Sequence, residues 1–120
     1  MVLHILGRSE WEIAQRKGFY SPRSLEVEGF IHCSTVAQII ETANLFYRGR
    51  QDLLVLRIDE RKLISRLEFE APATAGDQRP ETLFPHIYGR LNLDAVIDAV
   101  DLPCEPDGTF RLPSALAATP

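Results

Sequence analysis

The sequence predicts an α+β fold with two main helices, followed mostly by strands. The chain begins with two strand–helix units and continues mostly with strands, an order that separates helices from strands rather than alternating them. Its 120 residues, 45% hydrophobic and 25% charged, have the size and composition of one globular domain. We therefore expect a single domain at residues 1–113, followed by a loose tail at residues 114–120.

The first strand and the first helix are predicted from an apolar run and a capping motif. Residues 2–6 are almost wholly apolar and predict a strand. Ser9 with Glu12 three residues later fits a capping box, so a helix is expected to start there, and Gly18 is a suitable C-cap. Residues 19–28 show no helical period, which predicts a loop long enough to act as a flap.

A second strand and helix follow this loop. Residues 30–33 predict a buried strand, and Ser34 or Thr35 is expected to open the next helix. Thr35 with Gln38 fits a second capping box, and apolar residues then recur at helical spacing until Gly49 ends the helix.

The rest of the chain is predicted to consist mostly of strands. Residues 53–58 are nearly all apolar, as in a central strand, and Asp59 is placed to cap one helical turn through Leu63. Apolar and acidic residues alternate over residues 67–71, as in a half-exposed strand. The remaining segments are a proline-containing loop at residues 72–81 and strands at residues 84–88 and 95–100.

Charge and cysteine content limit the classes of partner. The formal charge of −4 argues against general binding of nucleic acid, which requires lysine and arginine to neutralise phosphates. No apolar run approaches the length of a membrane helix, and the N-terminus lacks the pattern of a signal peptide. The two cysteines, Cys33 and Cys104, form no CxxC motif. We expect a cytoplasmic monomer or weak homodimer, with Cys33 packed as a small hydrophobic residue.

The candidate site includes the stretch 29–35 and the three histidines. His4, His32 and His86 each lie in a short apolar strand rather than in a polar loop. Alternation along a strand places Ser34 on the face of His32, and Tyr88 on the face of His86. If these faces converge, they form a pocket of imidazole, hydroxyl and phenol groups that suits a small polar or nucleotide-like ligand. The alternative is that each histidine is partly buried and bonded to the backbone.

Three other roles in this stretch can be weighed from spacing. His32 and Cys33 are adjacent, so on a strand they point apart, and a thiol nucleophile paired with this histidine is disfavoured. The histidines have no spacing typical of a zinc site, so no metal is predicted. Ser34 has a competing structural role as a helix N-cap, beside which a phosphate or carboxylate would also be attracted.

Two motifs carry a resemblance to a known family. The stretches GFIHCST at residues 29–35 and FPHIYG at residues 84–89 resemble the bacterial and plant family catalogued as domain of unknown function 952. The resemblance extends from His4 to about Val100. It implies an ADP-ribosyltransferase-like fold, which is a split, mostly antiparallel β-sheet with a cleft that binds NAD. A weaker likeness to tRNA 2′-phosphotransferases rests on His4, on His32 with Ser34, and on Ile58-Asp59.

The resemblance implies roles for the residues of the predicted pocket. NAD or a related nucleotide is the implied ligand, and its proposed contacts are His4, Ser34, Thr35 and Tyr88. If chemistry occurs, His32 and His86 are the acid–base candidates, because imidazole titrates near neutral pH. The glutamate that ADP-ribosyltransferases use has no marked counterpart here: Glu68, Glu70 and Glu81 are all available.

Three functions therefore stay open from the sequence. The first is an enzyme with chemistry like ADP-ribosyl transfer. The second is a non-catalytic module that binds a small metabolite, and the unplaced glutamate favours it. The third is a structural or interaction domain with no small ligand, in which the histidines are only packed.

Overall fold

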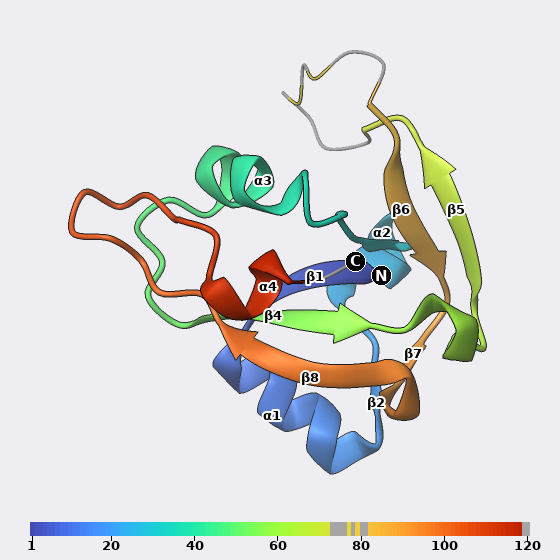
Figure 1. Cartoon of the computed structure of the whole chain (residues 1–120). Coiled ribbons are helices and arrows are strands. Elements are labelled where there is room, and N and C mark those ends of the chain that lie inside the picture. The colour runs from blue at the N-terminus through green and yellow to red at the C-terminus, as the bar shows by residue number, and fades with distance from the viewer. Residues whose placement is uncertain (73–76, 78, 80–81, 119–120) are drawn as a thin grey trace.

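The structure is a computed structural model and describes residues 1–72, 77, 79 and 82–118. Its strands form three antiparallel sheets, with the orders β1-β4-β8, β3-β6-β5 and β2-β7, and helices cover them (Figure 1). The predicted α+β class with antiparallel pairing is therefore confirmed. The strands are β1 Val2–Gly7, β2 Phe19–Tyr20, β3 Ile31–His32, β4 Leu53–Ile58, β5 Arg66–Glu70, β6 Phe84–Tyr88, β7 Leu91–Asn92 and β8 Val96–Asp101.

The helical elements are short. The longest is α1 at Arg8–Lys17, followed by α2 at Arg23–Val27, α3 at Ile39–Phe46 and α4 at Ser114–Ala117. Two 3-10 turns complete them, η1 at Glu60–Lys62 and η2 at Leu93–Ala95. No helix among the described residues has the length and apolar character needed to cross a membrane.

The β1-β4-β8 sheet has a hydrophobic core on each face. The predicted central strand at residues 53–58 is confirmed, because β4 lies between β1 and β8 and is almost wholly buried. On β1, Val2 and Leu6 point into a first core that includes Ala14 of α1. The alternate residues Leu3 and Ile5 point into a second core, which is covered by α3 and α4. Helices α1 and α3 accordingly lie on opposite sides of this sheet (Figure 1).

The β3-β6-β5 sheet is joined to the β1-β4-β8 sheet by one backbone bridge. Leu3 and Ser34 each donate an amide to the carbonyl of the other, with both N···O distances 2.8 Å. Ile31 and Ile87 of the smaller sheet also pack in the first core together with Leu56 of β4. The two sheets therefore share buried apolar surface as well as hydrogen bonds, and the stretch that carries His32 and Ser34 lies where they meet.

The first helix begins earlier than the sequence predicted. Its N-cap is Gly7, whose amide donates to Glu10 Oε1 at 3.1 Å, so the expected capping box of Ser9 with Glu12 is wrong. The physical reason is that β1 continues to Gly7 and passes into the helix with no intervening turn. The other end agrees with the prediction: Gly18 caps the helix in the left-handed region at φ 90°, and its amide donates to the Ala14 carbonyl.

The predicted second capping box is half present. The Thr35 amide donates to Gln38 Oε1 at 2.9 Å, but neither Ser34 nor Thr35 caps the helix with its side chain. A turn separates them from α3, which starts at Ile39 and ends at Phe46, before Gly49. The N-cap role considered for Ser34 is therefore not the one that the structure gives it.

Two segments predicted as irregular contain regular structure. Residues 19–28, expected as a loop, form β2, which pairs with β7, and the short helix α2. Both elements are too short to show a period in the sequence. Residues 114–117, expected within a loose tail, form α4, and Leu116 is completely buried in the second core. The loop expected at residues 72–81 lies largely outside the described residues.

Candidate functional site

A cavity of about 490 Å³ opens where β1, α2, α3 and β6 face one another. This volume is within the range typical of small-molecule sites. Four of the predicted site residues line it, and two do not, namely Thr35 and Tyr88. The four that line it are His4, His32, Ser34 and His86.

His86 is the most buried of the three histidines, with 2% of its surface exposed. Its Nδ1 lies 2.9 Å from Glu70 Oε1, so a carboxylate from the neighbouring strand β5 orients the ring. Phe30 stacks on one side of the ring, with the centroids 4.2 Å apart. Within the described part of the chain, Nε2 of His86 has no hydrogen-bond partner. One nitrogen of a buried imidazole is therefore available to whatever occupies the cavity.

His32 lies directly opposite His86 in the β3–β6 ladder. The two rings are 5.6 Å apart and meet edge to face. The strand faces on which alternation placed these side chains therefore meet, which the sequence left as a condition. His32 Nε2 lies 2.8 Å from Oε2 of Glu28, at the end of α2. His32 is 32% exposed and stands closer to solvent than His86.

His4 differs from the other two because both of its ring nitrogens have protein partners. Nδ1 lies 2.6 Å from the His32 carbonyl oxygen, which can only accept, so Nδ1 carries the proton. Nε2 then accepts a hydrogen bond from the Tyr20 hydroxyl at 2.8 Å. Burial lowers the pKa of His4 to about 4, and it raises the pKa of Tyr20, which keeps the hydroxyl proton for this bond. His4 therefore braces the wall of the cavity and leaves no nitrogen free for the ribose or phosphate contact expected from the sequence.

Ser34 presents a buried hydroxyl to the cavity. The residue is 3% exposed, and its backbone is fully used in the bridge to Leu3. Its Oγ has no hydrogen bond with any residue that the structure describes. A buried polar atom without a partner is costly, by about 1–3 kcal/mol, unless a ligand or water satisfies it.

In the described part of the chain three arginines line the cavity, and one of them has no partner there. Arg50 pairs with Asp52 at 3.2 Å. Arg79 pairs with Asp77 at 2.6 Å. Arg23, the first residue of α2, has no hydrogen bond or ion pair among residues 1–72, 77, 79 and 82–118, which leaves its guanidinium available to an anion.

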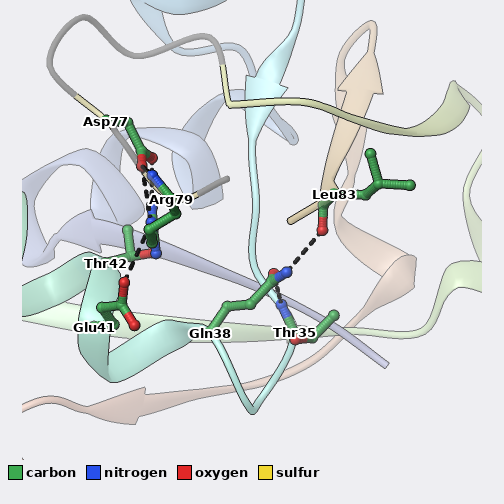
Figure 2. Close-up of polar contacts among 7 residues, drawn as sticks. All are labelled: Thr35, Gln38, Glu41, Thr42, Asp77, Arg79 and Leu83. Carbon is green, nitrogen blue, oxygen red and sulfur yellow. Dashed lines mark hydrogen bonds and ion pairs between the residues drawn. The ribbon is translucent and has the colours of Figure 1, made fainter. Parts of the chain in front are cut away.

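Polar contacts hold the residues beside β6 against α3. Figure 2 shows Arg79 reaching both Asp77 and the hydroxyl of Thr42, the latter at 2.9 Å. Gln38 serves two purposes in the same view: its Oε1 accepts from the Thr35 amide, and its Nε2 donates to the Leu83 carbonyl at 2.7 Å. These contacts fix one side of the cavity mouth, and Arg79 also lies 4.3 Å from the centre of the Phe84 ring.

The two predicted residues outside the cavity have other partners. Thr35 serves the turn that leads into α3, through its amide and its carbonyl. Tyr88 donates its hydroxyl to Glu70 Oε1, the same oxygen that faces His86 Nδ1. Cys33 is buried in the first core, and burial raises the pKa of its thiol, so the prediction that it packs as a small hydrophobic residue is confirmed.

Sequence reasoning missed the carboxylates that face the histidines. Glu70 was one of three equal candidates, and Glu28 was not considered. The choice of Glu70 depends on the β5–β6 register, which places Glu68 opposite His86 and leaves Glu70 to reach the ring diagonally. No three His, Cys, Asp or Glu side chains among the described residues are grouped so as to hold a metal ion.

Comparison with known proteins places the chain in a family. No curated protein matches it. Its fold is similar to the crystal structure of protein CC0527 from Caulobacter crescentus, with 32% identity, a TM-score of 0.84 and 97% of each chain covered. The solution NMR structure of CC0527 is also similar, with 32% identity, a TM-score of 0.76 and coverage of 92% of this chain and 91% of that one. A family model described as "protein of unknown function (DUF952)" matches residues 5–99, so the chain belongs to this family.

Proposed function

We propose that the cavity binds a small phosphate-bearing ligand of the nucleotide class, NAD or a related nucleotide. One observation carries the proposal: three residues that line the same cavity each have a polar group without a partner among the described residues. They are the Arg23 guanidinium, Ser34 Oγ and His86 Nε2. The guanidinium suits an anion, the Ser34 hydroxyl suits a hydroxyl or carbonyl group of a ligand, and the His86 nitrogen suits a hydroxyl that donates to it.

The remaining lining supports a ligand with both charged and aromatic parts. Phe46, Tyr47 and Phe84 contribute aromatic surface against which a base or a nicotinamide ring can pack. Arginine binds phosphate through a planar fork of donors, which makes Arg23 the expected phosphate contact. Because the whole chain carries a formal charge of −4, attraction of an anion here must come from this local arrangement.

A finer proposal concerns fold and chemistry. The split antiparallel sheets, with the cavity beside their junction, support an ADP-ribosyltransferase-like fold, as the resemblance to the family implies. In that case the chemistry is similar to ADP-ribosyl transfer, with His32 or His86 as the acid–base group.

Thermal unfolding with a ligand panel tests the binding. The panel contains NAD, ADP-ribose, AMP, nicotinamide and inorganic phosphate. A nucleotide at 100 times its dissociation constant is expected to add about 2.7 kcal/mol to the free energy of unfolding. If none of the nucleotides shifts the transition, the proposal fails and a domain without a small ligand is favoured. Mass spectrometry after incubation with NAD then separates turnover from binding alone.

Matched arginine variants test the location. Arg23→Gln is expected to weaken nucleotide binding about tenfold or more, because it removes a charge-assisted hydrogen bond to phosphate. Arg16→Gln is the control, since Arg16 is also an exposed arginine without a partner among the described residues, and it does not line the cavity. Equal affinities of the two variants by calorimetry would place the ligand elsewhere.

A further inference from the structure

We propose that Glu70 is a positioning residue for His86, and that it makes His86, rather than His32, the general base of the cavity. The group that loses its proton to His86 is a hydroxyl of the ligand or a water molecule. Only the identity of the reacting ligand rests on the proposed function; the arrangement of Glu70, His86 and Tyr88 does not.

The first step of the argument is the tautomer of His86. Hydrogen bonds from Tyr88 and from His86 hold the pKa of Glu70 below its ordinary value, so Glu70 is a carboxylate at neutral pH and can only accept. The proton on the neutral ring therefore sits on Nδ1, which faces Glu70 Oε1 at 2.9 Å. The lone pair is then on Nε2, the nitrogen without a protein partner, and a lone pair is what a general base requires.

The second step is that the carboxylate and the ring are both fixed. The Tyr88 hydroxyl donates to the same Glu70 oxygen, and the carboxylate raises the pKa of Tyr88, so this donor keeps its proton. The Arg66 guanidinium lies 4.5 Å from the centre of the Tyr88 ring. Phe30 stacks on the imidazole itself. A ring held by a hydrogen bond and a stacked neighbour presents Nε2 in one direction.

The third step is the contrast with His32. The Nε2 of His32 is bonded to Glu28, which leaves Nδ1 as its nitrogen without a partner, but Glu28 has no second donor comparable to Tyr88 among the described residues. The His32 ring is 32% exposed, whereas the His86 residue is 2% exposed. The His86 ring is therefore better screened from bulk water than the His32 ring, and both residues line the cavity.

The proton balance of the proposed step is simple for NAD and water. The water O–H bond breaks as a new N–H bond forms on His86 Nε2, and the oxygen forms a bond to C1′ of the nicotinamide ribose. The C1′–N bond breaks, and its electron pair goes to the nicotinamide nitrogen, which becomes neutral. The imidazolium formed on His86 is stabilised by the Glu70 carboxylate and then returns its proton to solvent.

Two measurements test the positioning without any nucleotide. In ¹⁵N-histidine NMR at pH 8, His86 is expected to be protonated on Nδ1 alone, and Glu70→Leu is expected to give a mixture of tautomers. Acylation by diethyl pyrocarbonate, mapped by mass spectrometry, is expected to be at least about tenfold faster at His86 than at His4, whose nitrogens are both bonded. An unchanged tautomer in Glu70→Leu, or labelling of His4 and His86 at equal rates, would overturn the arrangement.

Glu68→Gln is the matched control for the chemistry. Glu68 lies on the same strand and the same face, opposite His86, but it pairs with Arg66 at 3.5 Å rather than with the imidazole. Glu70→Gln is expected to lower kcat for NAD hydrolysis about tenfold to a hundredfold with KM little changed, while Glu68→Gln leaves both unchanged. His86→Asn is expected to lower kcat for NAD hydrolysis more than Glu70→Gln does. His32→Asn is expected to lower it less than His86→Asn does.

The outcomes separate this inference from the proposed function. If no nucleotide binds, the proposed function fails, and the tautomer and labelling results alone decide whether Glu70 positions His86. If NAD binds and is not hydrolysed, the general-base role is wrong and binding without catalysis is favoured. If hydrolysis occurs but is lowered more by His32→Asn than by His86→Asn, the assignment of the base is wrong.

Discussion

His4 has its two ring nitrogens bonded to the His32 carbonyl and to the Tyr20 hydroxyl, and it is buried. Burial favours the neutral ring and outweighs the hydrogen bond to the His32 carbonyl, which favours the charged ring. In an unfolded chain the same side chain takes up a proton near pH 6.5, whereas its folded pKa is about 4. Between these two values the unfolded state binds more protons than the folded state, so the contribution of His4 to stability depends on pH.

The free energy of unfolding is therefore expected to fall as the pH falls from about 6.5 to 4, with His4 contributing about 3 kcal/mol of that loss. The contribution is fully present above pH 6.5 because the depressed pKa favours the neutral form. Urea denaturation at a series of pH values measures this slope. His4→Gln removes the titrating group and should flatten the curve in this range, although it also lowers stability at pH 7. An equally steep curve in the variant would assign the slope to other groups.

At the scale of residues, the sequence predicted which face of a strand a side chain lies on better than which side chain it contacts. Alternation along a strand is local, and it correctly placed His32 on the side where its ring meets that of His86. It could not predict that Glu70 faces His86, because that contact depends on how β5 is aligned with β6. Nor could it distinguish His4 from the other histidines, since the Tyr20 hydroxyl comes from β2, in a segment expected to be a loop.

Among the elements, α4 is the clearest departure from expectation. Its sequence is rich in alanine and is flanked by prolines. A helix of four residues in such a sequence shows no visible hydrophobic period. Leu116 nevertheless packs in the second core with Leu3 and Ile5 of β1. Strands β4 and β6 were predictable because their apolar runs are long, whereas α2 and α4 depend on what they pack against.

Leu116→Ala is expected to destabilise the protein by about 2–5 kcal/mol, because it leaves a cavity at a side chain that is completely buried. Leu112→Ala, a few residues earlier and 40% exposed, is the matched control and should cost less than about 1 kcal/mol. Chemical denaturation of both variants measures the difference. Equal effects would mean that the C-terminal segment contributes little to the fold, as a loose tail would.

At the scale of the whole molecule, the two three-stranded sheets share one hydrophobic core. Ile31 and Ile87 of one sheet and Leu54 and Leu56 of the other belong to the first core. Opening the smaller sheet alone would expose apolar surface of both. The sequence predicted antiparallel strands in a split arrangement, but not which strand joins the halves, because the Leu3–Ser34 bridge pairs residues distant in the chain.

Native-state hydrogen exchange is expected to show one cooperative unit. The amides of Leu3 and Ser34, which bond across the junction, should have the same free energy of opening for exchange as the amide of Leu56 in β4. The reason is the shared core, whose disruption costs as much as global unfolding. Faster exchange at Ser34 and across β3 and β6, with β4 still protected, would show that the smaller sheet opens independently.

Arg23 lies on α2, whereas His32 and His86 lie on the paired strands β3 and β6, and this division has a consequence for how such a protein diversifies. The spacing of the two imidazoles is fixed by sheet geometry, so it survives changes in the short connection between β2 and β3. That connection contains Arg23, which lines the cavity and, alone among the lining arginines, has no partner in the described structure. Exchanging residues 21–27 between relatives, with Glu28 kept, is thus a route to new ligand preference while His32 and His86 retain their carboxylate partners.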